Sequence, residues 1–161
     1  NLTPDRNDQA QFQKLLEAAK TWKEQIRAGH LPRKLAWESM TTTIVSTLHH
    51  PLPATTMSLK QCAAIMTPTL QAGLPCSGIV RTFPRALEYG PIEYQGLGIP
   101  NLYTSQGISH IERILKYSHL DDDITGQLIR ASVEQLKLEI GCNGPVLSLP
   151  FADFAKLATN C

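Results

Sequence analysis

Apolar residues recur at helical spacing along the first half of the chain. From Asp8 onward they fall on one face of a helix that Gly29 is expected to end, namely Phe12, Leu15, Leu16, Ala19, Trp22 and Ile26. A second helix is predicted to open at Pro32. It ends before Pro51, and its apolar positions are Trp37, Met40, Ile44, Val45 and Leu48.

A third helix is predicted behind Ser58, because Ser58 and Gln61 have the spacing of a capping box. Its apolar stripe contains Leu59, Cys62, Ala63, Met66 and Leu70. Gly73 and Pro75 are expected to terminate it. The β-branched run 41–45 is less favourable for helix, but it shows no alternation of period two, so the second helix is kept.

The next segment, 73–100, is rich in glycine and proline and is predicted to be irregular, with a short helical turn over 85–89. A long helix is expected from Pro100–Asn101, another after the acidic run 121–123, and a last one over 150–158. We therefore predict an all-α fold, an irregular bundle of about five or six helices in a single helical domain over residues 1–161.

Charge and composition narrow the functional classes. The chain of 161 residues carries a net charge of +1, and 18% of its residues are charged. Autonomous nucleic-acid-binding domains usually have a basic excess, so any such role must rest on a local patch or on other parts of a longer protein. Residues 1–7 are expected to be frayed, and both ends look cut, with a truncated C-terminus.

The cellular compartment that we expect for the protein follows from features that the sequence lacks. No apolar run approaches the roughly 20 residues of a membrane span. No signal peptide opens the chain, and no C-x-x-C pair is present. We therefore expect an intracellular protein with reduced thiols and no membrane contact, with nucleus and cytoplasm both open.

Aspartate, histidine and cysteine side chains are the candidates for metal or nucleophilic chemistry. The carboxylates of 121–123 stand between two predicted helices, where a capping role fits better than two-metal catalysis. His49 and His50 have no partners at zinc-site spacing, and Cys62 belongs to an apolar face. Cys76 lies in the Gly/Pro segment without a recognisable base. We expect no catalytic residue, no metal and no cofactor.

Arg81 and Arg85 are the best candidates for a binding site. They flank a Thr-Phe-Pro sequence, so two guanidinium groups and an aromatic ring lie close together along the chain. Such a group can hold a phosphate and stack on a base or sugar. The alternative is that both arginines bond loop carbonyls and Glu88. Arg113 and Lys116, on the later helix, are further candidates for backbone contact, against the alternative of a solvated face.

The order of motifs resembles a known family. LAWESM is followed by SLKQCAAIMTPTLQAGLP, VRTFPRALEYGP, YQGLGIPNLYTSQG and ISHIERILKY. This order is similar to the segment after the palm in reverse transcriptases of non-LTR retrotransposons, which forms the thumb and its connection. The family's proline-arginine pair corresponds to Pro84-Arg85. Its Gly-Gly-Leu-Gly-aliphatic element corresponds to residues 95–99, where Gln95 replaces the first glycine. The resemblance covers about residues 8–140 and is strongest over 35–115.

The resemblance implies a role in holding nucleic acid rather than in catalysis. The family's catalytic aspartates belong to the palm, and nothing in this chain matches them. A helical thumb contacts the backbone of an RNA–DNA or DNA template–primer duplex, so the expected partners are that duplex, bound weakly, and the remainder of the polymerase chain. The competing interpretation is a helical protein-interaction or scaffold module with no nucleic-acid role, which the near-neutral charge favours.

Overall fold

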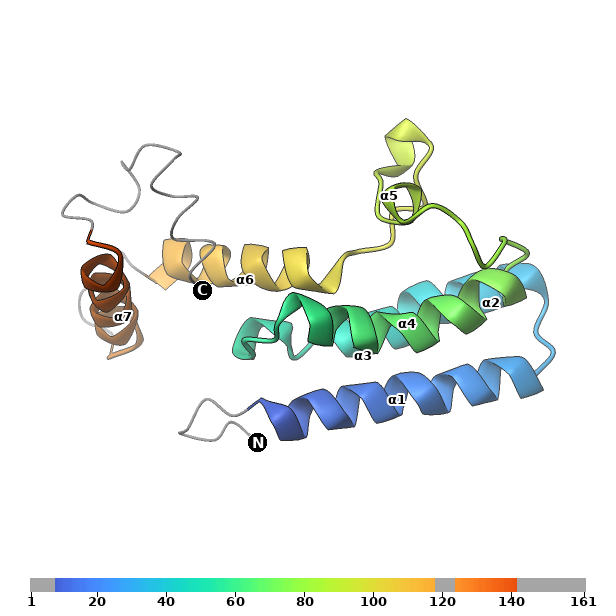
Figure 1. The fold of residues 1–161 in the computed structure, drawn as a ribbon, viewed down its shortest axis with the longest axis horizontal. Helices are drawn as coiled ribbons and strands as arrows, with labels where there is room; N and C mark the ends of the chain where they lie inside the picture. The colour runs from blue at the N-terminus through green and yellow to red at the C-terminus, as the bar shows by residue number, and fades with distance from the viewer. Residues whose placement is uncertain (1–7, 118–123, 142–161) are drawn as a thin grey trace. The chain divides into compact units, whose positions relative to one another are not determined.

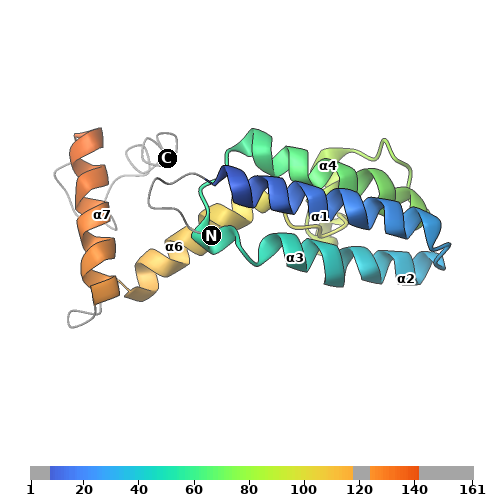
Figure 2. The same cartoon turned by 90° about the horizontal axis from the view of Figure 1, so that it is seen from below.

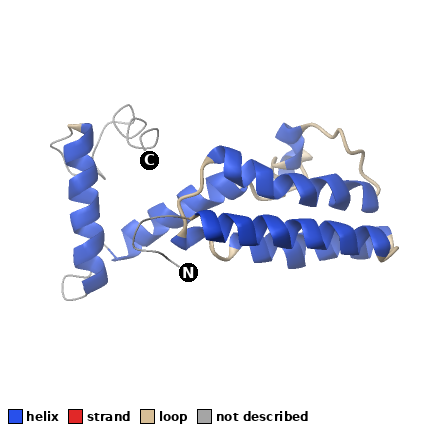
Figure 3. Cartoon of the chain, turned by 60° about the horizontal axis from the view of Figure 1, so that its bottom comes forward, coloured by secondary structure: helices blue, strands red, loops and turns tan. Residues whose placement is uncertain are grey.

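The computed structural model describes residues 8–117 and 124–141, and every regular element within them is helical. Figure 3 shows helices and loops in that part of the chain and no strand. The all-α prediction is therefore confirmed. The chain divides into two compact units, residues 1–110 and 111–161. The expectation of a single domain stays a prediction, and the helix expected over 150–158 lies outside the described residues.

Helix α1 (Gln9–Ala28) forms where the apolar stripe predicted it. Its buried residues are Leu15, Ala19, Trp22 and Ile26, and Gly29 caps the C-terminus by donating its N–H to the carbonyl of Gln25. The helix lies alongside α4 (Figures 1 and 2). The buried stripe of α1 thus supplies one wall of the core.

The second predicted helix contains an irregularity. Helix α2 (Arg33–Glu38) passes into a π-helical segment (Ser39–Ile44) and then into α3 (Val45–His49). The Thr41 hydroxyl donates to the carbonyl of Trp37 at 3.0 Å, and the Thr42 hydroxyl to that of Glu38 at 2.7 Å. Hydroxyls that bond carbonyls four residues back compete with the backbone ladder. The β-branched run therefore accompanies a wider turn, which the sequence did not predict.

Helix α4 (Leu59–Cys76) begins as predicted and ends later than predicted. The Ser58 N–H donates to Oε1 of Gln61 at 2.8 Å, and the Gln61 N–H donates to Oγ of Ser58 at 3.3 Å. The expectation that Gly73 would end the helix is wrong. Gly73 is buried inside α4, where a Cβ would collide with Met40 and would lie 3.3 Å from the Trp22 ring. The glycine is used for close packing rather than for termination.

A buried glutamine ties the start of helix α6 (Leu102–Tyr117) to the turn before α4. The Gln106 side chain donates to the carbonyl of Met57 at 3.1 Å and accepts from the Met57 N–H at 3.0 Å. The Thr55 hydroxyl also reaches its Oε1, at 3.3 Å. Asn101 caps the helix by accepting from the N–H of Tyr103. All the polar groups of this contact are paired, so it fixes where α6 leaves the bundle.

The second unit contains helix α7 (Ile124–Ile140), whose bounds match the helix expected after the acidic run. Gly141 follows it in the left-handed conformation, with φ of 74°, as is common just past a helix end. The acidic run 121–123 lies outside the described residues. Of the helices that the structure describes, none is long and apolar enough to cross a bilayer.

Candidate nucleic-acid interface

The predicted arginines lie on the segment that joins α4 to α6, here called the elbow (residues 77–101). It starts where Ser77 caps α4 and Gly78 takes a φ of 83°. A turn closed by the Phe83 N–H on the carbonyl of Val80 follows. Helix α5 (Arg85–Glu88) then forms the short turn that the sequence predicted, and Ile92–Tyr94 adds a single 3-10 turn.

Backbone hydrogen bonds close the second half of the elbow on itself. The N–H groups of Leu97, Gly98 and Ile99 donate to carbonyls in and just after α5, at 2.8, 2.9 and 3.1 Å. Gly96 lies so close to Gly90 that a Cβ at position 96 would collide with the Gly90 backbone. The elbow has long irregular stretches but a defined backbone path, so its side chains project from a stable frame.

The residue that interrupts the glycine pattern adopts a glycine-like conformation. Gln95 has φ of 62° and ψ of 19°, in the left-handed region that L-residues with a Cβ seldom occupy. It directly precedes Gly96, and Gly98 also has a positive φ, of 66°. The backbone path explains physically why glycine would be favoured at position 95.

Arg85 and Glu88 form the strongest polar contact of the elbow. Nη1 of Arg85 donates to Oε2 of Glu88 at 2.5 Å. The Glu88 side chain is fully buried, whereas that of Arg85 is 53% exposed. The second carboxylate oxygen of Glu88 is buried and makes no hydrogen bond to any described residue. The bond to Glu88 is the alternative that the sequence left open, and it engages one edge of the guanidinium while half of the side chain stays accessible.

A cleft of about 230 Å³ opens beside this pair. Arg85, Tyr89 and Asn101 form its polar side, and the other side is mainly the apolar face of α4 with Leu102. Burial raises the pKa of the Tyr89 phenol, the positive charge of Arg85 opposes that shift, and Glu88 adds to it. The phenol therefore stays neutral at physiological pH and can donate a hydrogen bond.

The remaining predicted arginine and the two cations of α6 are exposed. Arg81 stands in the turn before α5, with no hydrogen bond or ion pair to another residue of the described ranges. Arg113 is exposed as well, and Lys116 lies 5.4 Å from the ring centre of Tyr117. Arg81 and Arg85 belong to the first unit, and Arg113 and Lys116 to the second. Arg81 and Arg85 thus lie on one exposed segment, the elbow, and Arg113 and Lys116 on one exposed stretch of α6.

The cysteines and histidines are the candidates for nucleophilic chemistry or metal binding. Cys62 is buried, as its place in the apolar stripe predicted, and burial raises the pKa of its thiol. A raised pKa keeps the thiol protonated and unreactive at neutral pH. Cys76 is free and partly exposed. Within residues 8–117 and 124–141, no three histidine, cysteine or acidic side chains gather in a way that would hold a metal ion.

Sequence reasoning missed a second concave surface, which lies between the start of α2 and the elbow. It combines Arg33 and Trp37 with Ser77, Ile79 and Leu97, which are far apart along the chain. The glycine at position 78 is the one local sequence feature that fits the approach of the Arg33 side chain to the backbone there. Comparisons of the chain with known protein families, with curated proteins and with solved structures find no match.

Proposed function

We propose that the chain is a non-catalytic, thumb-like segment of an RNA-directed DNA polymerase that contacts the backbone of a template–primer duplex. The observation that carries the proposal is the exposure of two guanidinium groups, those of Arg81 and Arg85, on an elbow with a defined backbone path. Guanidinium groups bind phosphate oxygens with two parallel hydrogen bonds, and contacts of this kind position a duplex without reading its sequence.

The glycine pattern of the elbow supports the resemblance on physical grounds. The family's element has glycine where this chain has Gln95, and the backbone at Gln95 is left-handed. The following glycine, Gly96, is required by the approach of Gly90. The backbone path of the elbow therefore gives a physical reason why the family's motif has glycine at these positions.

The low net charge sets the expected affinity. Two phosphate contacts from the elbow predict that the logarithm of the binding constant falls with the logarithm of salt with a slope of about −2. Binding by this chain alone is therefore weak and best seen at low ionic strength. The remainder of the polymerase chain would supply further cations.

The direct test is the titration of a labelled RNA–DNA hybrid at low salt. Arg81→Ala is the cleanest variant, because the Arg81 side chain has no hydrogen-bond or ion-pair partner among the described residues and its loss should leave folding unchanged. We expect a several-fold loss of affinity and a salt slope closer to zero by about one. Lys20→Ala, which removes one cation from the exposed side of α1, is the matched control and should change little.

Arg85 needs a second measurement, because it also bonds Glu88. Arg85→Ala is compared with Arg85→Lys, which keeps a positive charge beside the carboxylate, and both are checked by circular dichroism before titration. Equal hybrid affinity for wild type, Arg81→Ala and a folded Arg85→Ala protein would remove the elbow from the contact role.

A protein-interaction module without a nucleic-acid role is the second candidate. The observation that favours it is a row of exposed apolar side chains on one face of α6, with Ile108, Ile111 and Leu115 being 50%, 44% and 42% exposed. Exposed apolar rows often mark contact with another chain. Two results together would favour this candidate over the first. The hybrid would fail to bind at any salt concentration, and the chain would self-associate, or capture a partner in a pull-down, in a way that Ile111→Glu abolishes.

A further inference from the structure

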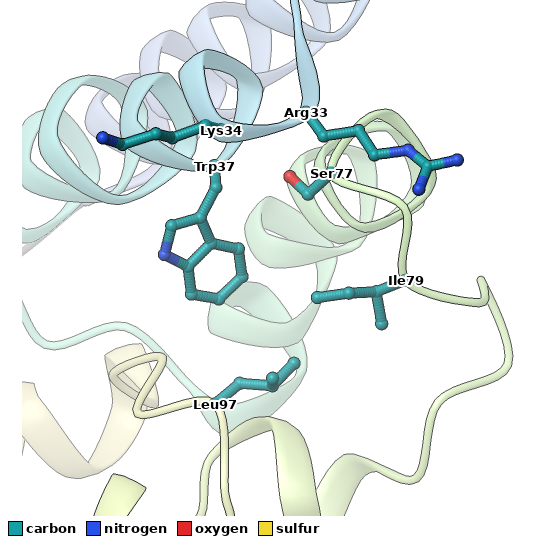
Figure 4. A pocket seen from close by; sticks show the side chains of 6 residues that line it. All are labelled: Arg33, Lys34, Trp37, Ser77, Ile79 and Leu97. Carbon is teal, nitrogen blue, oxygen red and sulfur yellow. The ribbon is translucent and has the colours of Figure 1, made fainter.

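A concave surface of about 290 Å³ lies where the start of α2 faces the elbow. Figure 4 shows its six lining side chains, which are Arg33, Lys34, Trp37, Ser77, Ile79 and Leu97. The indole ring of Trp37 stands in the middle, and the side chains of Ile79 and Leu97 point toward it. None of these residues belongs to the predicted contact set at Arg81 and Arg85.

The pocket is held in place from two sides. The Arg33 side chain packs against Gly78, where a Cβ would lie 2.9 Å from Cδ and 3.0 Å from Nε of Arg33. The Ile79 N–H donates to the carbonyl of Leu74 at 2.9 Å, which fixes the elbow to the end of α4. Trp37, Ile79 and Leu97 are partly buried against the core. The apolar floor is therefore built into the fold.

The rim of the pocket carries positive charge. In Figure 4 the charged ends of Arg33 and Lys34 point outward on opposite sides of Trp37. The carboxylate of Glu38 approaches Lys34 only to 3.9 Å, and both side chains are solvent-exposed, so the pair neutralises little. Arg33 has no ion pair within the described part of the chain.

One polar atom buried in the pocket wall has no hydrogen-bond partner among the described residues. Oγ of Ser77 is buried and makes no hydrogen bond to any described residue, although buried hydroxyls are normally bonded. In Figure 4 this oxygen points away from Ile79 and Leu97, so it belongs to the pocket wall rather than to the open space. The pocket thus offers an aromatic side chain, an apolar floor and two cations.

We propose that this pocket binds an unpaired nucleotide of single-stranded nucleic acid. The base lies against Trp37 and the apolar floor, and the flanking phosphates meet Arg33 and Lys34. Stacking on an aromatic ring within a positive groove is the general way in which proteins hold single strands without sequence preference. The small volume suits one ring system rather than a larger ligand. This inference rests on the proposed nucleic-acid role, and it adds a site for a strand that is not in duplex form.

The test titrates the full chain with a labelled oligo(dT) of about ten nucleotides, and in parallel with a blunt RNA–DNA hybrid. Binding should quench tryptophan emission, because Trp37 is partly exposed whereas Trp22 is buried in the core. Trp37→Ala should weaken oligo(dT) about tenfold and leave the hybrid within about twofold. Trp37→Phe, which keeps an aromatic face, should retain most of the affinity and lose the quenching. Hybrid binding retained by Trp37→Ala shows that the alanine variant is folded.

The cations are tested separately with Arg33→Ala/Lys34→Ala. This variant should bind oligo(dT) more weakly, with a salt slope reduced in size by about one to two. The control Lys20→Ala/Arg27→Ala removes the same charge from exposed positions of α1 and should leave the slope unchanged.

The two proposals fail in different ways. Oligo(dT) binding that Trp37→Ala does not change overturns the pocket assignment, even if the hybrid still depends on Arg81. If the hybrid does not bind while oligo(dT) binds in a way that depends on Trp37, the duplex role is overturned and the pocket assignment is supported. Absence of quenching and of oligo(dT) binding overturns the pocket assignment.

Discussion

The carboxylate of Glu88 is completely buried, and Arg85, three residues earlier, supplies its ion pair from a side chain that is half exposed. One residue thus serves two needs that compete. The guanidinium compensates a buried charge, and the same group is one of the two phosphate ligands that we propose for the elbow. A phosphate that drew Arg85 fully outward would leave Glu88 without its partner, so the pair limits how strongly Arg85 can bind a duplex.

This relationship predicts an asymmetric pair of variants. Arg85→Ala leaves a buried carboxylate unpaired and should lower the free energy of unfolding by about 1–3 kcal/mol, between the values for exposed and for fully buried pairs because Arg85 is partly solvated. Glu88→Gln in the same background removes the unpaired charge and should recover part of that loss. Urea unfolding of the wild type, both single variants and the double variant gives the coupling energy. A coupling near zero would contradict a structural role for the pair.

Binding should respond in the opposite sense. Glu88→Gln releases Arg85 from a competing carboxylate, so we expect the single variant to bind an RNA–DNA hybrid a few-fold more tightly at low salt. Fluorescence anisotropy measures the change. Glu93→Gln removes a charge from the same elbow at a position that makes no ion pair with another described residue, and it is the matched control. Equal gains in both variants would reduce the effect to net charge alone.

Gln95 predicts a stabilising substitution. Its backbone is left-handed, a conformation that costs an L-residue about 1–2 kcal/mol and glycine nearly nothing. Part of that gain is offset because glycine has more freedom in the unfolded chain. Gln95→Gly should therefore raise the free energy of unfolding by about 0.5–1 kcal/mol. Gly96→Ala, one position later, should destabilise strongly because its Cβ would collide with Gly90. Denaturant titration of the two variants tests both signs, and destabilisation by Gln95→Gly would be the contrary result.

The sequence predicted those elements whose signals are local. The stripe of α1 and the Ser58–Gln61 capping box each lie within a few turns of chain, and both are present as expected. The π-helical segment was missed because a run of β-branched residues disfavours a regular helix without specifying what replaces it. The pocket at Trp37 was missed for a different reason. Its residues meet only through tertiary packing, and no spacing rule joins Arg33 to Ser77.

Gly73 in α4 and Gly107 in α6 show that tertiary packing decides the effect of a glycine-to-alanine substitution on stability. Gly73→Ala places a Cβ against Met40 in the core and should destabilise by about 1–3 kcal/mol through overpacking. Gly107→Ala adds a Cβ with nothing within 4 Å, in the interior of α6, and should stabilise by up to about 1 kcal/mol. Thermal unfolding of both variants distinguishes them, although propensity alone predicts the same sign for both. A stabilised Gly73→Ala protein would show that the α1–α4 contact is looser than the structure has it.

Alkaline pH should weaken the fold through the buried thiol of Cys62 and the partly buried phenol of Tyr89. Burial raises the pKa of Cys62 and of Tyr89, so the folded chain holds both protons at pH values where the unfolded chain releases them. Stability from these groups is complete below the unfolded pKa values and declines as pH rises, first above about 8.5 for the thiol and then above about 10 for the phenol. Urea midpoints measured from pH 7 to 10.5 should therefore fall in two stages. Cys62→Val, which fills the site without a thiol, should abolish the first stage and keep the second. A midpoint that falls equally in the variant would show that the thiol is not the group responsible.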